Sequence, residues 1–128
     1  MPNDGNETFD MEHLLELAEE KKYRLLKEEL VELNEVDIAS FIEELDSERT
    51  VIVFRMLPKA LATEVFAELP VDKQSHIINS ITDKELSEIV EELYVDDAVD
   101  LVEELPATVV RRVLQNTKPE TRKLINQF

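Results

Sequence analysis

Cysteine is absent from this sequence, and glycine occurs only once, as Gly5. A chain without cysteine has no disulfide, no thiolate metal ligand and no cysteine nucleophile. With one glycine it has no glycine-rich loop to hold phosphates, and tight β-hairpins are disfavoured. Apolar runs are short as well: the stretch 51–54 is far below the roughly 20 residues that cross a bilayer. The start of the chain lacks signal-peptide character, so we expect a chain that is not itself inserted in a membrane.

Basic residues are scarce beside acidic ones. The 14 Lys and Arg residues stand against 30 Asp and Glu residues, which gives a formal net charge of -16. A surface of this sign repels the phosphates of nucleic acids, which are therefore excluded as a partner. It attracts cations, and hard ions such as Mg²⁺ and Ca²⁺ take oxygen ligands. Most of these acids are nevertheless expected only to solvate helix surfaces.

A twelve-residue repeat organises most of the chain. The sequence has 128 residues, 43% of them hydrophobic, which is enough for one domain with a continuous core. From Asn34 onward, apolar residues fall mainly at positions five, eight, nine and twelve of a block, the i, i+3, i+4, i+7 spacing of an amphipathic helix. Two columns are predicted to form the core: position eight holds Phe41, Val53, Val65, Ile77, Ile89, Leu101, Val113 and Ile125, and position twelve holds Leu45, Leu57, Leu69, Ile81, Leu93 and Leu105 before Thr117.

Each block begins with a residue that starts a helix. Pro58, Pro70 and Pro106 suit a first helical turn, and Thr82 with Glu85 has the spacing of a capping box. One block is therefore one short helix with its turn. About nine helical residues make a rod of roughly 13 Å, which is too short to be stable alone. Stability must come from stacking of neighbouring helices.

The repeat predicts an all-α fold, a solenoid of about ten short antiparallel helices. Two helices over 9–21 and 22–33 precede the repeat, while residues 1–8 are expected to be disordered and 9–128 to form the domain. A coiled coil is the other all-helical alternative. Pro58, Pro70 and Pro106, which lie 12 and 36 residues apart, interrupt the heptads that it needs, so the solenoid is favoured.

Candidate catalytic residues are few. His13 and His76 are the only histidines, and neither has a serine or second histidine at a spacing that suggests catalysis. We expect both to be surface or half-buried helix residues. Paired carboxylates are abundant, but a general acid needs a pocket that raises its pKa, and the sequence indicates none. The chain is therefore predicted not to be an enzyme.

Three aspartates form the acidic cluster that stands out. Asp96, Asp97 and Asp100 are three and four residues apart, so a helix places them on one face. They are candidate ligands for a divalent cation. The alternative is that aspartates in a first turn stabilise the positive end of the helix dipole, by about 0.3–1 kcal/mol each.

Several blocks also end in Glu-Glu-Leu, which places acids in a last helical turn. There they oppose the helix dipole and are mildly destabilising unless a cation or a basic partner lies nearby. The pairs are Glu43 and Glu44, Glu91 and Glu92, and Glu103 and Glu104.

The run 37–128 resembles the N-terminal intracellular domain of MgtE magnesium channels. The resemblance is clearest in Leu-Pro-Lys-Ala-Leu-Ala-Thr-Glu-Val-Phe-Ala-Glu-Leu (57–69) and Val-Asp-Asp-Ala-Val-Asp-Leu-Val-Glu-Glu-Leu-Pro (95–106). It implies a right-handed superhelix of short helices, followed by two cystathionine β-synthase-type domains, a connecting helix and a dimeric transmembrane pore. In that family Mg²⁺ bound between the cytosolic domains holds the pore closed.

The resemblance also implies site residues. The acids that the family uses at this interface match Asp96 and Asp100, and Glu64 matches another family acid near the same surface. The spacing adds Asp97. The chain ends about where the family passes into its first cystathionine β-synthase domain, so these acids are expected to form half-sites for Mg²⁺. The expected function is Mg²⁺-sensing regulation on the cytoplasmic face of the cell membrane, as part of a homodimeric integral membrane protein.

A second interpretation needs no metal. The middle domain of the flagellar rotor protein FliG resembles this chain in helix length and repeat, and armadillo-type solenoids bind partner helices on a concave surface. Such a protein-interaction domain is the alternative to Mg²⁺ sensing. Cystathionine β-synthase repeats and apolar segments of about 20 residues downstream would favour the channel.

Overall fold

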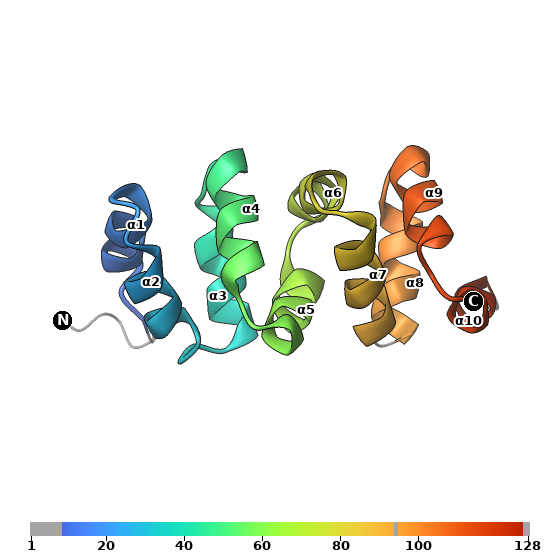
Figure 1. Ribbon diagram of the computed structural model, residues 1–128, viewed down its shortest axis with the longest axis horizontal. Helices are drawn as coiled ribbons and strands as arrows, with labels where there is room; N and C mark the ends of the chain where they lie inside the picture. Colours follow the sequence, from blue (N-terminus) through green and yellow to red (C-terminus); the bar gives the residue numbers. More distant parts are fainter. Residues whose placement is uncertain (1–8, 94, 127–128) are drawn as a thin grey trace.

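The computed structural model describes residues 9–93 and 95–126, apart from the side chains of 95–97, 101 and 124–126. The described residues form ten α-helices and no β-strand, so the predicted all-α class is confirmed. The helices follow one another along an elongated molecule, with α1 and α10 at opposite ends (Figure 1). The disorder predicted for 1–8 falls outside the described residues. The helices are α1 (Met11–Glu19), α2 (Tyr23–Leu30), α3 (Glu35–Glu43), α4 (Ser47–Met56), α5 (Lys59–Glu68), α6 (Val71–Ser80), α7 (Asp83–Glu92), α8 (Val95–Glu104), α9 (Ala107–Gln115) and α10 (Pro119–Asn126).

The helix starts follow the residues that the repeat places there. Thr82 and Glu85 form the predicted capping box, in which each side chain accepts a backbone N–H of the other residue. The three prolines lie at the N-cap, one position before the first helical turn that we predicted for them. Their extended backbone redirects the chain, and their carbonyl oxygens accept the first helical hydrogen bonds, as in Ala62 N–H to Pro58 O at 2.8 Å.

Packing follows a period of two helices. Close contacts join α1 to α3, α2 to α4, α3 to α5, α4 to α6, α5 to α7, α7 to α9 and α8 to α10. The unit that repeats in space is therefore a pair of helices, or 24 residues, which agrees with a solenoid. The right-handed superhelix stays a prediction. No described helix is long and apolar enough to cross a lipid bilayer.

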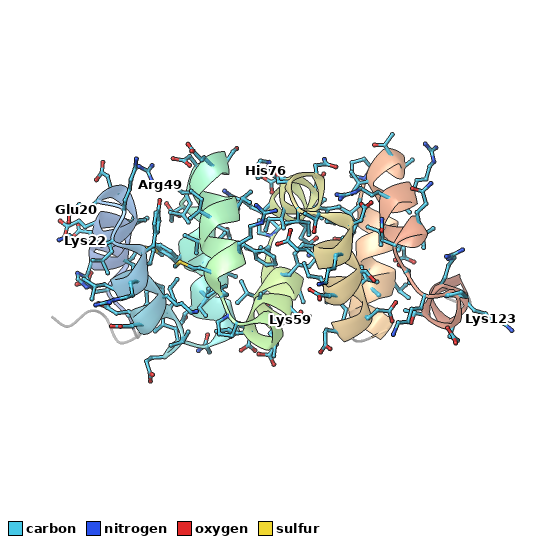
Figure 2. The ribbon with its side chains drawn as sticks, in the orientation of Figure 1. Glu20, Lys22, Arg49, Lys59, His76 and Lys123 are labelled. Atoms are coloured by element: carbon cyan, nitrogen blue, oxygen red, sulfur yellow. The ribbon has the colours of Figure 1, made fainter. Side chains whose placement is uncertain are left out.

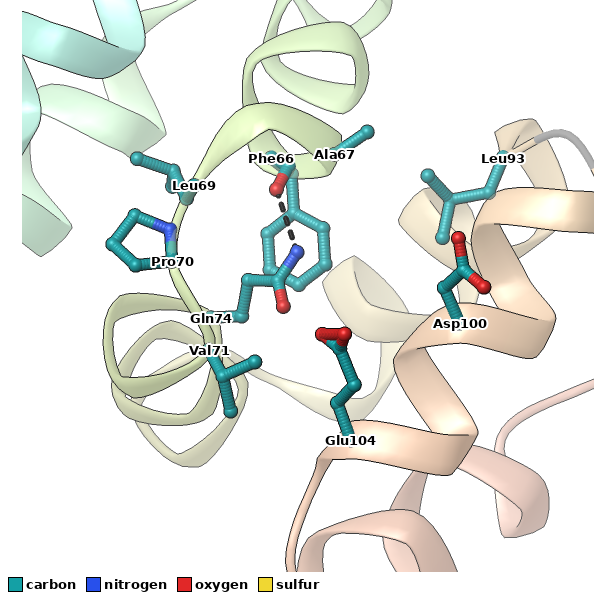
Figure 3. Close-up of a pocket in the computed structure, with 9 residues that line it drawn as sticks. All are labelled: Phe66, Ala67, Leu69, Pro70, Val71, Gln74, Leu93, Asp100 and Glu104. Atoms are coloured by element: carbon teal, nitrogen blue, oxygen red, sulfur yellow. Dashed lines mark hydrogen bonds between the residues drawn. The ribbon is translucent and has the colours of Figure 1, made fainter.

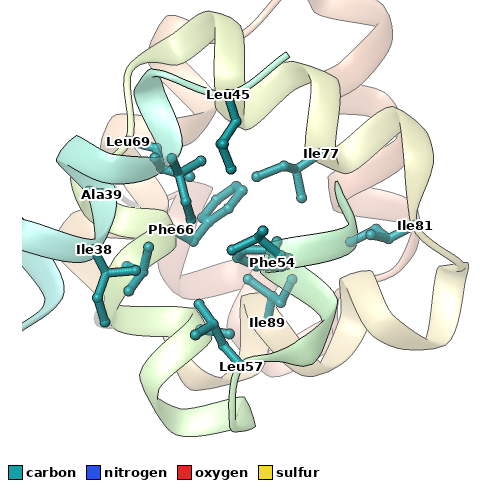
Figure 4. Close-up of a cluster of buried hydrophobic side chains, with 14 of the residues drawn as sticks. Ile38, Ala39, Leu45, Phe54, Leu57, Phe66, Leu69, Ile77, Ile81 and Ile89 are labelled. Carbon is teal, nitrogen blue, oxygen red and sulfur yellow. The ribbon is translucent and has the colours of Figure 1, made fainter. Parts of the chain in front are cut away.

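The predicted core columns are buried. All described side chains at position eight are buried, and position twelve is buried except for the half-buried Leu93. Leu101 and Ile125 fall outside the described side chains. Near the centre, the rings of Phe54 and Phe66 meet with their centroids 6.0 Å apart (Figure 4). Successive blocks thus share one hydrophobic core.

Basic side chains of α6 and α9 donate hydrogen bonds to backbone carbonyls at the C-terminal ends of α3 and α6. The Lys73 ammonium of α6 donates to Leu45 O at 2.6 Å, just beyond the end of α3. The Arg112 guanidinium of α9 donates to Ile78 O and to Ile81 O, the latter at 2.7 Å, at the end of α6. Free carbonyls and a positive charge are complementary at a helix C-terminus. Each contact ties a helix to the third helix after it.

Charged side chains cover the outside of the stack (Figure 2). One ion pair joins α4 to α7. Arg55 Nε and Nη2 donate to the two carboxylate oxygens of Glu85 at 3.1 and 2.8 Å. The side-chain hydrogen bonds from Arg55, followed by the backbone N–H of Thr82, lower the pKa of Glu85 from 4.5 to about 2. This bidentate ion pair holds α7 against α4. Helix α7 lines the candidate site described below.

The Glu85 carboxylate should make stability depend on acid pH. Because its pKa is lower in the folded state, its contribution is complete above pH 4.5 and disappears as the pH falls through about 2. At pH 7 we expect Glu85→Gln to destabilise the chain by roughly 0.5–1.5 kcal/mol, since the pair is partly exposed but bidentate and belongs to a cap. Urea denaturation at pH 7, 4 and 2 measures the free energy of unfolding of both chains. The difference in this free energy between Glu85→Gln and the original chain should become smaller toward pH 2.

The matched control is Glu48→Gln, which removes an acid that lies in none of the ion pairs between described residues. The free energy of unfolding of Glu48→Gln should stay within about 0.5 kcal/mol of that of the original chain. A Glu85→Gln difference that stays constant from pH 7 to pH 2 would contradict the lowered pKa.

Candidate functional site

Two adjoining hollows lie where α5, α6, α7 and α8 approach one another. The first hollow has a volume of about 300 Å³ and opens between α6 and α8 (Figure 3). The second hollow has a volume of about 410 Å³ and lies over α5 and the end of α7. Ala67 and Leu93 line both, so we treat the two hollows as one acidic trough. The first is lined by Phe66, Ala67, Leu69, Pro70, Val71, Gln74, Leu93, Asp100 and Glu104, and the second by Glu35, Ala60, Thr63, Glu64, Ala67, Glu68, Glu92 and Leu93.

The twelve-residue repeat places most of the acids in this trough. Positions seven and eleven of a block are four residues apart, so their side chains leave one face of the helix together. Glu64 and Glu68 occupy these positions in α5, and Asp100 and Glu104 occupy them in α8. With Glu35 of α3 and Glu92 of α7, the described lining residues include six carboxylates and no basic side chain.

The predicted metal-binding residues divide into two groups. Glu64 lines the second hollow and Asp100 lines the first, so the structure brings these two acids to neighbouring hollows of one face. Asp96 and Asp97 belong to α8, which confirms the predicted helix. Their side chains fall outside the part of the structure that is described, and their role as ligands stays a prediction.

The trough is better suited to bind an ion that keeps its waters than to enclose a bare ion in protein ligands. Among the described side chains, no three acids or histidines lie close enough to hold one metal ion together. Mg²⁺ keeps several of its waters and is commonly bound through one or two carboxylates. The first hollow, with a volume of about 300 Å³, has room for such waters. The described residues thus suit a Mg²⁺ ion that retains water or takes further ligands from another domain.

The sequence carried a signal for Gln74 that the repeat analysis missed. Gln74 stands at position five of its block, where Ile38, Ala62 and Leu86 stand in others. Its side chain is buried at 8% exposure, and its Nε2 donates to Phe66 O at 2.9 Å. Thr50 and Arg122 are the other polar residues in this mostly apolar column, so a polar residue at position five is the pattern that marks Gln74.

The Glu-Glu pairs at the helix ends are explained only in part. Glu91 accepts hydrogen bonds from the Lys118 backbone N–H at 2.8 Å and from Thr121 Oγ1 at 2.7 Å. The hydrogen-bond donors to Glu91 thus come from the beginning of α10. Glu92 and Glu104 instead line the trough, and no described residue donates to either carboxylate.

The two histidines do not line the trough. Their positions agree with the expectation of surface or half-buried helix residues. His13 is exposed and lies 2.8 Å from the Glu29 carboxylate, whose hydrogen bond raises the pKa of His13. His76 is half-buried and its Nε2 lies 2.9 Å from Ser47 O. Both contacts join helices, so the histidines have structural roles here.

Comparisons with known proteins agree with this architecture. The crystal structure of the cytosolic domain of the Mg²⁺ channel MgtE in complex with ATP is 31% identical, with a TM-score of 0.75, and is matched over 91% of this chain and 48% of that one. The crystal structure of the soluble part of a magnesium transporter is 19% identical, with a TM-score of 0.75, over 92% of this chain and 48% of that one, and shares the fold. The chain thus spans about half the length of each.

No curated protein sequence matches the chain. The family described as MgtE intracellular N domain matches residues 33–128, which covers the whole repeat and includes every acid of the trough. This match extends over most of the sequence and confirms the resemblance seen in segments 57–69 and 95–106. The chain belongs to the family of MgtE intracellular N domains.

Proposed function

We propose that this chain is a Mg²⁺-sensing regulatory domain on the cytoplasmic face of a magnesium channel or transporter. It binds Mg²⁺ through Glu64, Asp96, Asp97 and Asp100 at an interface with neighbouring cytosolic domains and so favours pore closure. The observation that carries the proposal is the acidic trough, in which Glu64 and Asp100 line adjoining hollows. The similar structure of a Mg²⁺ channel's cytosolic domain supports the choice of ion.

Shared sites explain how an ion would act on a pore. A ligand shifts a conformational equilibrium only by its difference in affinity for the two states. Carboxylates of this chain supply part of the ligand set, and cystathionine β-synthase-type domains of the same protein supply the rest. The set is complete only when the domains are close together, so Mg²⁺ stabilises the closed arrangement. Two such chains form a homodimer around the pore in this proposal.

Electrostatic repulsion between the domains opposes the closed arrangement when Mg²⁺ is scarce. The chain carries a net charge of -16, and six carboxylates line the trough. A second acidic surface is repelled from this face when Mg²⁺ is scarce, and a bridging divalent ion removes the repulsion. Low internal Mg²⁺ thus separates the domains, and high internal Mg²⁺ joins them.

Nucleotide binding is a property of the related structure that contains ATP. Six carboxylates and no basic side chain line the described trough, beside apolar residues and the neutral Thr63 and Gln74, so the trough repels a negatively charged triphosphate. We therefore assign to this trough no nucleotide and no catalytic role.

The second candidate is a protein-interaction domain that needs no metal, as in flagellar or armadillo-type solenoids. It is favoured by the observation that no three described acids or histidines lie close enough to hold an ion. In this case a basic partner segment would occupy the trough. Mg²⁺ would then act only by screening, as any salt does.

Substitution of Glu64 in a channel that contains this domain tests the proposal. Glu64→Gln keeps the side-chain volume and removes one charge from the second hollow. We expect the internal Mg²⁺ concentration for half-maximal closure to rise roughly two- to tenfold, as expected for one screened charge near a divalent ion. Glu48→Gln, outside both hollows, should leave it unchanged. Equal responses of both variants would support the interaction domain without metal.

A further inference from the structure

The last two helices carry a charge opposite to that of the rest of the chain. Residues 107–126 contain five Lys or Arg residues and one Glu, a net charge of +4. Residues 1–106 contain nine Lys or Arg residues and 29 Asp or Glu residues, a net charge of -20. Helices α9 and α10 lie at one end of the elongated molecule (Figure 1). We call these two helices the basic end.

Most positive charges of the basic end have no acidic partner. Only Arg112 forms an ion pair between described residues, with Asp83 at 2.9 Å. Arg122 donates from Nη2 to Thr117 O at 3.1 Å, and its buried Nε has no hydrogen-bond partner among the described residues. Lys123 extends away from the stack in Figure 2. The exposed cations are Arg111, Lys118 and Lys123. Unpaired cations gathered in this way form a surface for an anionic partner.

The basic residues at the other end of the molecule do not form a second surface of this kind. Segment 11–30 contains four Lys or Arg residues but six Glu residues, a net charge of -2. Lys22 pairs with Glu20 at 3.1 Å. The positive surface is therefore confined to α9 and α10.

A surface of the complementary charge exists on the same chain. The trough is lined by six carboxylates and by no basic side chain among the described residues, so the basic end does not neutralise its own trough. The trough lies mainly over α5 to α8, and the basic end follows in the stack (Figure 1). A second copy in the reversed orientation can offer its basic end to this trough and receive the basic end of the first. Two identical contacts of this kind close a pair around a twofold axis.

We propose that the basic end of one copy docks on the acidic trough of a second copy, with Arg111, Lys118 and Lys123 facing carboxylates such as Glu64 and Glu68. The inference rests on the proposed function for its setting, in which two chains share one pore and Mg²⁺ uses the same trough. It goes further because it assigns a partner to the basic end. It also gives the trough an occupant when Mg²⁺ is scarce, so that Mg²⁺ and the basic end compete.

Local attraction can act between two chains that each carry a charge of -16. The Debye length is about 8 Å at physiological ionic strength, so charges far from the contact act weakly across it. Opposite charges within about 4 Å of each other in the contact attract more strongly. Two copies held at one pore have an effective concentration on the order of 1 mM, at which even a weak polar contact is populated.

Sedimentation equilibrium of the 128-residue chain, up to about 1 mM, tests the pairing. We expect the average mass to rise above the 14.8 kDa of one chain. Arg111→Glu combined with Lys123→Glu, the acidic-end variant, should weaken the dimerisation Kd roughly tenfold or more. The matched control is Arg24→Glu combined with Lys27→Glu, which changes an exposed arginine and a last-turn lysine of α2 and should weaken it less than about twofold. A mass that stays at 14.8 kDa, or equal weakening by both variants, would overturn the proposal.

An exchange of charges tests the trough as the docking surface. Glu64→Lys combined with Glu68→Lys makes the second hollow basic at two exposed positions. This chain and the acidic-end variant should each pair poorly alone but pair with each other when mixed. Glu28→Lys combined with Glu48→Lys, outside both hollows, should pair with the acidic-end variant roughly fivefold more weakly. Equal pairing by the two mixtures would overturn the proposal.

Mg²⁺ should dissociate the pairs of the original chain more than NaCl does at matched ionic strength, and equal effects would overturn the competition. If the chain stays monomeric but binds vesicles of anionic lipid through Arg111 and Lys123, the occupant is a membrane and the proposal fails. If Mg²⁺ closes the channel but no pairs form, only this inference fails. If pairs form and exchange as expected but channel closure ignores Mg²⁺, the proposed function fails.

Discussion

Replacing Phe66 by Ala is expected to lower the free energy of unfolding by about 3–5 kcal/mol, as measured by denaturant titration. The Phe66 side chain is 1% exposed and packs against the ring of Phe54. It projects from α5, which contacts both α3 and α7, so truncation opens a cavity between stacked pairs (Figure 4). Neighbouring short helices cannot collapse into that cavity without breaking their own packing.

Two leucines in α2 provide matched controls for this prediction. Leu26 is fully buried and Leu25 is 45% exposed, although they are adjacent in sequence. Leu26→Ala should cost about 2–5 kcal/mol, while Leu25→Ala should stay near about 0.5 kcal/mol. A similar loss in Leu25→Ala and Phe66→Ala would show that the inward and outward faces have been assigned wrongly.

The helices and their buried faces could be predicted from the sequence because one period governs both. A block of twelve residues with four apolar positions forms about two and a half helical turns with one apolar stripe. Burial of Phe41, Val53 and Val65 at position eight follows directly. Even Thr117, which ends a column of aliphatic residues, is buried, because its Oγ1 donates to Val113 O.

The relative placement of the helices could not be predicted in the same way. A periodic pattern identifies the inward face of each helix, but it does not fix which other helix meets that face. The close contact of α6 with α9 is an example. It accompanies the hydrogen bonds of Arg112 to carbonyls of α6, and nothing in the spacing of a single arginine indicates such a partner.

The candidate site could be predicted from the sequence only in part, for the same reason. Asp96, Asp97 and Asp100 share a spacing that also suits a helix start. Since α8 begins at Val95, Asp96 and Asp97 lie in its first turn, where the dipole explanation holds. Asp100 lies beyond that turn and lines a hollow, so the dipole does not account for it. Its proximity to Gln74 depends on the packing of distant blocks.

In a channel that contains this domain, we expect Asp96→Asn combined with Asp100→Asn to weaken closure by Mg²⁺ without abolishing transport. Two charges are removed at nearly constant volume, so the attraction for a hard cation falls while helix packing is preserved. The internal Mg²⁺ concentration for half-maximal closure should rise roughly tenfold or more. Channel recordings or Mg²⁺ uptake at several internal Mg²⁺ levels measure this change.

The matched control is Glu28→Gln combined with Glu48→Gln, which removes two exposed charges outside both hollows. It separates a specific site from the general effect of the net charge of -16, because screening acts on both double variants alike. In the isolated chain the Asp96 and Asp100 changes should alter the melting temperature only slightly, since lost dipole complementarity opposes relieved repulsion. An unchanged closure curve would mean that these aspartates act only at a helix end. Loss of transport altogether would mean that the domain contributes to the pore itself and not only to its regulation.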